Sequence, residues 1–82
     1  MDKRLGFVGI VVEDRKKSGP KVNEVLSGFG DLIVARMGLP HVAKGCSVIT
    51  LIVDATTDQV GELTGRLGAM DGVSVKSAMS KI

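Results

Sequence analysis

His41 and Cys46 are the residues of this chain whose side chains are best suited to metal binding or nucleophilic chemistry. They lie five positions apart across a predicted hairpin loop, and the sequence contains one histidine and one cysteine in total. A nickel site needs several nitrogen or sulfur ligands, and a cysteine hydrolase needs a third group that orients the base. We therefore expect a loop histidine and a buried cysteine, with no metal site and no cofactor.

Sequence motifs that would support catalysis are absent. The chain contains none of the patterns GxxxxGKS/T, GxSxG, HExxH and CxxC, which cradle phosphates, present nucleophiles or hold metals. Glu13 and Asp14 are adjacent, so on a strand their carboxylates would point to opposite faces and could not form an acid–base pair. These observations predict a protein that is not an enzyme.

The basic residues are few, and they do not form a surface that would bind nucleic acid. Eleven Lys and Arg against nine Asp and Glu give a net charge of +2, and a dedicated nucleic-acid binder clusters its basic residues on one face. The cluster Arg15–Lys17 follows two acidic residues and is typical of a solvated loop.

Arg36 stands alone among apolar neighbours, and two interpretations are open. Its stem lies along a sheet with the charge at the edge, or its guanidinium binds an anion or carboxylate.

The first half of the chain predicts a strand, a loop and a helix. Residues 5–12 (LGFVGIVV) form an apolar run sized for a buried strand, and Gly6 and Gly9 within it indicate a bulge or a close backbone approach. Residues 13–20 (EDRKKSGP) are predicted as a loop, because Ser18, Gly19 and Pro20 are typical of a helix start. The helix is predicted at residues 21–30, with one apolar face formed by Val22, Val25, Leu26 and Phe29.

The second half predicts strand, turn, strand, helix and strand. Strands are expected at residues 31–39 and 47–53, separated by a turn over residues 38–45. A helix should follow, with Thr56 or Thr57 as its N-cap and with an apolar stripe of Val60, Leu63, Leu67 and Met70. Asp71-Gly72 should end it before a last strand at Val73–Lys76. The helix also carries a glycine stripe, for which we expect close packing against a neighbour: Gly61, Gly65 and Gly68.

This order, βαββαβ, predicts an α+β ferredoxin-like fold with a four-stranded antiparallel sheet and two helices on one face. In that topology the first and third strands are central, and these are the two most apolar runs. The 82 residues are expected to form a single domain, 1–82. A core without Trp or Tyr is thin for so small a domain, so we expect a homodimer or homotetramer.

The cysteine count and the length of the apolar runs indicate where in the cell the protein is located. One cysteine excludes an internal disulfide, and the sequence has neither a signal peptide nor an apolar run of about 18 residues. We therefore expect a soluble cytoplasmic protein that does not associate with a membrane.

Four segments of the sequence together resemble one known family: VVEDR (11–15), VNEVL (22–26), ARMGLP (35–40) and GELTGRLGAMDGVSVK (61–76). They look like the small proteins described as iron-only hydrogenase system regulators, and the resemblance covers nearly the whole chain. That family is ACT-like and similar to the ligand-sensing C-terminal domain of the nickel-responsive repressor. The resemblance implies an ACT-like fold and a regulatory role in the iron-only hydrogenase system.

ACT domains typically bind a small molecule, often an amino acid, near the first strand-to-helix loop and at a subunit interface. In this sequence the resemblance, together with the residue types, gives a set of ligand-binding candidates: Glu13, Asp14, Arg15, Ser18, Gly19 and Arg36. Lys16 to Ser18 look like extra length in the loop, and a helix start near Gly19 would offer N–H groups to a carboxylate. We predict an oligomeric, ligand-sensing regulatory domain that binds an amino-acid-like molecule, without direct contact to nucleic acid. The alternative is a ligand-free protein–protein interaction module.

Overall fold

The computed structural model describes residues 2–81, with residue 42 described in its backbone only. Its strands and helices are β1 (Arg4–Val12), α1 (Arg15–Gly28), β2 (Ile33–His41), β3 (Cys46–Ala55), α2 (Thr57–Gly68) and β4 (Val73–Met79). Short 3-10 turns, Gly30–Leu32 and Val42–Lys44, precede and follow β2. No helix in the described residues is long and apolar enough to span a membrane.

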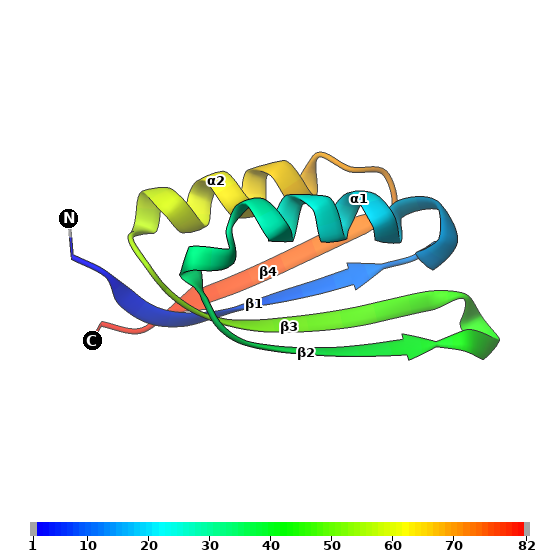
Figure 1. Cartoon of the computed structure of the whole chain (residues 1–82), viewed down its shortest axis with the longest axis horizontal. Helices are drawn as coiled ribbons and strands as arrows, with labels where there is room; N and C mark the ends of the chain where they lie inside the picture. Colours follow the sequence, from blue (N-terminus) through cyan, green and yellow to red (C-terminus); the bar gives the residue numbers. More distant parts are fainter. Residues whose placement is uncertain (1, 82) are drawn as a thin grey trace.

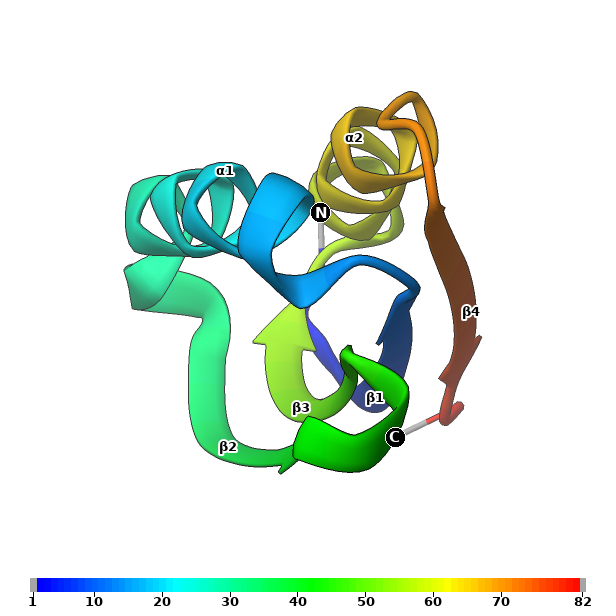
Figure 2. The same ribbon diagram turned by 90° about the vertical axis from the view of Figure 1, so that its right-hand side faces the viewer.

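The four strands form one antiparallel sheet in the order β2-β3-β1-β4. Both helices lie on the same side of this sheet (Figures 1 and 2). This arrangement confirms the predicted ferredoxin-like fold, including the central positions of β1 and β3. The predicted turn before β3 is shorter than expected, because β2 continues to His41 and pairs there with Cys46.

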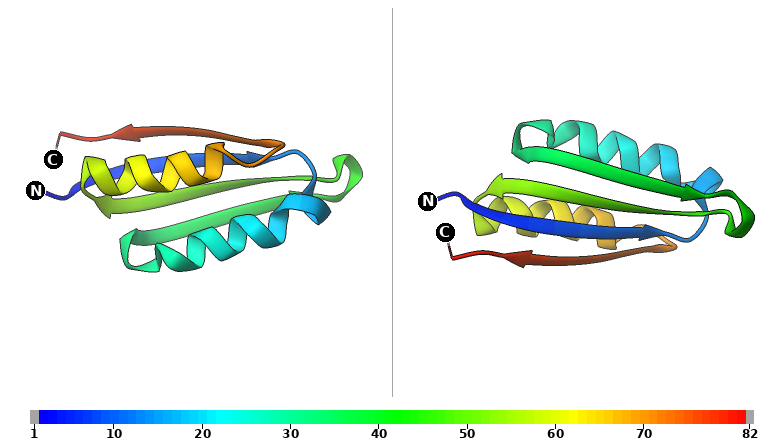
Figure 3. Two further views of the ribbon diagram at one scale, coloured as in Figure 1. Left: turned by 90° about the horizontal axis from the view of Figure 1, so that it is seen from above. Right: turned by 90° about the horizontal axis from the view of Figure 1, so that it is seen from below.

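The core lies between the sheet and the two helices. Alternate residues of β1 and β3 point toward the helices, as the period of two along a strand requires. Side chains from α1 and α2 close over them, so that the innermost residues are completely or almost completely buried: Val8, Ile10, Val12, Val22, Leu26, Leu51, Val53, Leu63 and Leu67. Seen from below in Figure 3, the other face of the sheet is covered by none of the described elements.

Helix α2 is capped where the sequence predicted. The Thr56 hydroxyl accepts a hydrogen bond from the Gln59 N–H (3.1 Å), and the Gln59 side chain accepts one from the Thr56 N–H (2.9 Å), which forms a capping box. The helix ends at Gly68, before the predicted Asp71-Gly72. Gly72 instead turns the chain into β4, with a φ of 71° that favours glycine.

Helix α1 begins at Arg15, so the predicted loop over residues 13–20 was wrong. Asp14 is the N-cap, and its side chain accepts a hydrogen bond from the Lys17 N–H (3.2 Å). Ser18 is buried against the α2–β4 turn, where its hydroxyl donates to the Asp71 carbonyl (3.2 Å). These contacts extend the inward face of the helix by one turn. They outweigh Pro20, which lies inside the helix and removes one backbone hydrogen bond.

The glycines of β1 and α2 differ in how closely other atoms approach them. A Cβ at Gly6 would lie 2.4 Å from Met79 Sδ and 2.6 Å from the Ala78 carbonyl oxygen, which confirms a close approach there. A Cβ at Gly9 would meet only the Lys76 carbonyl oxygen, at an ordinary 3.8 Å. The predicted packing of the α2 glycines does not occur among the described residues, where Cβ atoms would meet nothing within 4 Å: Gly61, Gly65 and Gly68.

Candidate functional site

The structure separates the predicted ligand-binding residues into three places. The first is the connection between β1 and α1, which contains Glu13 and Asp14. The Glu13 N–H donates to the Gly72 carbonyl (2.8 Å), which joins this connection to the α2–β4 turn. Asp14 caps α1. Both side chains are exposed, and their contacts within the chain are those of residues that hold α1 in position.

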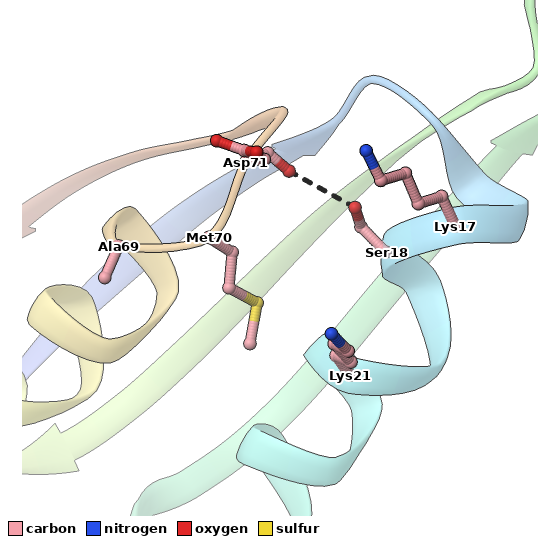
Figure 4. Close-up of a pocket in the computed structure, with 6 residues that line it drawn as sticks. All are labelled: Lys17, Ser18, Lys21, Ala69, Met70 and Asp71. Atoms are coloured by element: carbon pink, nitrogen blue, oxygen red, sulfur yellow. Dashed lines mark hydrogen bonds between the residues drawn. The ribbon is translucent and has the colours of Figure 1, made fainter.

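Ser18 lies in the second place, a cavity of about 420 Å³ between the first turns of α1 and the end of α2. Figure 4 shows its lining residues, with Lys17 and Lys21 extending from α1 and Asp71 on the opposite side. The Ser18 hydroxyl is occupied by its hydrogen bond to the Asp71 carbonyl. The cavity therefore offers a ligand two exposed lysine side chains and little that would fix its orientation.

Arg15, Gly19 and Arg36 come together in the third place, a groove of about 260 Å³ between α1 and β2. Arg15 is half-buried at the start of α1, and its N–H donates to the carbonyl of Gly45 (2.8 Å) in the β2–β3 turn. Gly19 lies one turn further along the helix. The early start of α1 is what brings Arg15 into this groove, because in the predicted loop it would have had no fixed position.

Arg36 points toward the helices, since its register partner on β3 is the buried Leu51. Its guanidinium donates a hydrogen bond to the side-chain oxygen of Asn23 on α1 (2.5 Å). The amide is a neutral partner. Among the described residues, neither Arg36 nor Arg15 has a carboxylate within the 4.0 Å of an ion pair. Two guanidinium charges thus share one groove without an acidic neighbour.

Ser47 is a groove residue that the sequence analysis missed. It is only 8% exposed, on the helix-facing side of β3, and its hydroxyl makes no hydrogen bond to any described residue. In the run SVITLIV a serine is easily taken for an ordinary strand residue. The available signal was its alternation with Ile49, Leu51 and Val53, which makes it the one hydroxyl on a buried apolar stripe. Asn23 was missed as well, because the helical periodicity placed it away from the apolar face.

The polar groups of the groove are mainly hydrogen-bond donors. Arg15 and Arg36 offer guanidinium N–H groups, Asn23 offers its amide N–H₂, and Ser47 can donate or accept. The rest of the lining is apolar or without a side chain: Gly19, Gly38, Leu39, Pro40 and Ile49. An array of this kind suits a small anion with a short apolar part, because arginine binds carboxylate and phosphate oxygens in a bidentate manner.

His41 and Cys46 face each other directly in the register of β2 and β3, so their side chains are cross-strand neighbours. Cys46 is half-buried, not fully buried as predicted, and His41 is exposed. In the part of the chain that the structure describes, no group of three or more His, Cys, Asp or Glu side chains is arranged to hold a metal ion.

Residues 4–77 match the family model of the TM1266-like proteins, described as "Iron-only hydrogenase system regulator, putative". The chain belongs to this family. The match spans almost the whole sequence and includes the four segments on which the resemblance was based. Comparison of the sequence with curated proteins finds no significant match.

Solved structures support the family assignment and extend the fold comparison. The uncharacterized protein TM1266 from Thermotoga maritima is 39% identical, with a TM-score of 0.92 over 98% of this chain and 100% of that one. The ACT domain from the GTP pyrophosphokinase of Chlorobium tepidum is 23% identical (TM-score 0.74, 93% and 99% covered). The C-terminal domain of the MgtC protein from Mycobacterium tuberculosis is 12% identical (TM-score 0.74, 98% and 90% covered). The last two show the fold alone, and the fold is ACT-like.

Proposed function

We propose that this member of the TM1266-like family is a regulatory domain that senses a small anion, acts as an oligomer and has no enzymatic activity. The observation that carries the proposal is the α1–β2 groove, in which Arg15, Arg36 and the Ser47 hydroxyl lie without acidic partners among the described residues. The family description and the ACT-like fold support the regulatory role. The ligand class that fits is an amino-acid-like carboxylate.

Two physical terms favour an anion in this groove. The Ser47 hydroxyl has no hydrogen-bond partner within the described residues and still reaches solvent, since none of their buried side-chain polar atoms lacks a partner; it can therefore bond to a ligand without breaking an internal hydrogen bond. A carboxylate between two guanidinium groups gains charge-assisted hydrogen bonds, which are about twice as strong as neutral ones. Asn23 holds Arg36 in place for this contact. Of the sequence-predicted residues, the proposal retains Arg15, Gly19 and Arg36.

The mechanism of regulation is linkage between ligand binding and assembly. A ligand can shift an equilibrium only by its differential affinity for the two states, and by reciprocity assembly then changes the affinity for the ligand by the same factor. The groove lies between α1 and β2, and β2 is an edge strand of the sheet. A ligand in the groove would hold β2 in one position, and this would change the surface that the β2 edge presents to a partner. Any contact with DNA would come from another chain.

The test is thermal unfolding in the presence of amino acids, short dicarboxylates and inorganic phosphate. An added dye is needed because the chain has neither Trp nor Tyr. Ligand at about 100 times its dissociation constant should add about 2.7 kcal/mol to the free energy of unfolding. Arg36→Ala should abolish this gain. Arg66→Ala is the control, because Arg66 is paired with Glu62 (3.2 Å) outside the groove. No stabilisation by any anion, or a full response in Arg36→Ala, would contradict the proposal.

The second candidate function is an interaction module without a ligand. The observation that favours it is the uncovered face of the sheet, on which several large apolar side chains are exposed. This candidate predicts association of the chain and no stabilisation by small anions, so the same unfolding experiment separates the two functions.

A further inference from the structure

We infer that the uncovered face of the sheet is the surface on which a second copy of this chain packs. This inference rests on the self-association in the proposed function and names the surface responsible for it; it does not depend on the anion groove. The surface, called the open face below, is formed by apolar residues of all four strands: Leu5, Phe7, Val11, Ala35, Met37, Leu39, Val48, Ile52 and Ala78.

The strand register places these side chains on one face. Phe7 pairs with Ile52 on one side and with Ala78 on the other. Register partners point to the same side of a sheet. The next residue along each strand points to the opposite side, and there Val8 on β1 and Leu51 on β3 are completely buried under the helices. The open face is therefore a continuous apolar surface that runs from one edge strand of the sheet to the other.

The exposure of this surface is unusual for a soluble monomer. Met37 is 74% exposed, Leu39 64% and Phe7 48%. Contiguous apolar patches above a few hundred Å² are rare on monomeric proteins and mark interaction sites. From strand spacing and rise, four strands of up to ten residues give a face of roughly 600 Å² in projection. Side-chain relief adds to this, which brings the area near the roughly 800 Å² that each partner buries in a standard interface.

The charge of the open face selects against partners of other kinds. The register places Lys76 on the edge strand β4 and Asp54 near the end of β3. The central positions hold Thr50 and Gly9, which carry no charge. A nucleic acid or an anionic lipid surface would require a cluster of basic residues, and an acidic partner would require the same. A second open face, whose central positions are likewise uncharged, meets no like-charge repulsion there.

The relief of the open face is self-complementary. Met37 and Leu39 protrude at the β2 edge, whereas the β1–β4 half contains an apolar hollow of about 440 Å³ lined by Leu5, Phe7 and Ala78, with Ile52 at its side. A two-fold axis that places the β2 side chains of one copy in the hollow of the other makes the reciprocal contact at the same time. In this arrangement each copy contributes both the protruding side chains and the hollow that receives them. The proposed occupant is therefore a second copy of this chain.

The experiment uses sedimentation velocity of the full chain over about three decades of protein concentration, from roughly 1 µM to 1 mM. The variant Met37→Glu places a charge on the open face. Thr57→Glu is the matched control, because Thr57 is an exposed residue at the start of α2 and receives the same charge. We expect the wild type and Thr57→Glu to associate, and we expect Met37→Glu to raise the dissociation constant at least 100-fold. Circular dichroism of each variant checks that it is folded.

A second measurement covers the case in which Met37→Glu fails to fold. In a mixture of isotope-labelled and unlabelled wild-type chains, isotope-filtered NMR should show cross-peaks between the methyl groups of Met37 and Ala78. Within one chain these residues lie on opposite edge strands, about 14 Å apart, so the cross-peaks can arise only between copies. A wild type that stays monomeric, unchanged association of a folded Met37→Glu, or absence of these cross-peaks in an associated sample would each overturn the inference.

The anion titration keeps the two proposals separate. Met37→Glu leaves the groove residues Arg15, Arg36 and Ser47 in place, so a monomeric Met37→Glu that is still stabilised by an anion supports both the open-face interface and the sensor. If the wild type is stabilised by an anion but remains monomeric, anion binding in the groove stands, whereas the open-face inference and the oligomeric part of the proposed function are both wrong. If the wild type associates but a folded Met37→Glu associates equally well, the open-face inference alone is wrong.

Discussion

The two faces of the sheet are built from the same kinds of residue, but only one of them is covered. On β1 and β3 the covered face carries Val8, Ile10, Leu51 and Val53, of which none is exposed. The open face carries Phe7, Val11, Val48 and Ile52, each 41–48% exposed. An antiparallel sheet with one solvated face normally alternates apolar and polar residues along each strand. These two strands do not, because both of their faces are apolar.

The sheet has two apolar faces, but the described helices cover only one of them. Both helices lie on the same side of the sheet, since each βαβ half has its crossover on that side. No described helix or loop remains for the other face. The apolar runs of β1 and β3 are those of strands buried on both sides, and in the inference above the second cover is another copy of the chain. The predictions below test how different the two faces are, in order of decreasing effect.

The largest difference should appear between neighbouring residues of β3. Leu51→Ala removes a completely buried side chain and should lower the free energy of unfolding by about 2–5 kcal/mol. Ile52→Ala, on the open face, should cost less than about 1 kcal/mol in dilute protein, because its side chain is already 41% exposed. Urea unfolding at low protein concentration measures both. Equal losses would mean that the open face is packed within a single chain.

The glycines of β1 provide a second pair. Gly6→Ala should lower the free energy of unfolding by about 1–3 kcal/mol, because the added Cβ would meet Met79 and the Ala78 backbone at less than 3.0 Å. Gly9→Ala adds a methyl group to the open face without such a contact. It should raise the free energy by up to about 0.5 kcal/mol, since glycine weakens a strand interior. The midpoints of urea unfolding compare the two. A loss in both variants would contradict the difference between the faces.

The fold was predictable because its signals are local and agree with the topology. The apolar runs of β1 and β3 and the N-cap of α2 can all be recognised in the sequence, and the structure confirms them. The start of α1 could not be recognised in this way. Ser18 and Pro20 are typical of a helix start, whereas the contact that extends the helix, Ser18 to Asp71, joins residues 53 positions apart. Long-range contacts of this kind override local propensity.

The candidate groove shows the same limit. Arg36 was recognised as a charge in an apolar strand, and Arg15 was recognised near the first helix. Their proximity depends on the early start of α1, which the sequence did not reveal. The direction of Arg36 toward α1 follows from the register of β2 with β3, and that register contains an irregularity between Ile33 and Ala35. Ser47 became visible as a candidate only when its buried position was known.

A smaller effect concerns the protein concentration. If the open face is covered by a second copy, apparent stability should rise with concentration, because assembly binds only the folded state. For a dimer the expected gain is about 0.7 kcal/mol per protomer for each tenfold increase, half the value of a tenfold change in an equilibrium constant. Thermal unfolding at several concentrations measures this gain. Met37→Glu should remove the dependence on concentration, whereas Thr57→Glu should retain it.

The smallest effect distinguishes two buried serines. Ser18 and Ser47 are 7% and 8% exposed, yet only Ser18 has a hydrogen-bond partner among the described residues. Ser18→Ala should cost about 1 kcal/mol, the typical net value of a hydrogen bond, and leave the Asp71 carbonyl short of a donor. Ser47→Ala should change the free energy of unfolding by less than about 0.5 kcal/mol, because there is no internal bond to lose. It should nevertheless weaken stabilisation by an anion, whereas Ser18→Ala should leave that response unchanged. A large stability loss in Ser47→Ala would show that its hydroxyl has a structural role, and the evidence for a ligand would then rest on Arg15 and Arg36 alone.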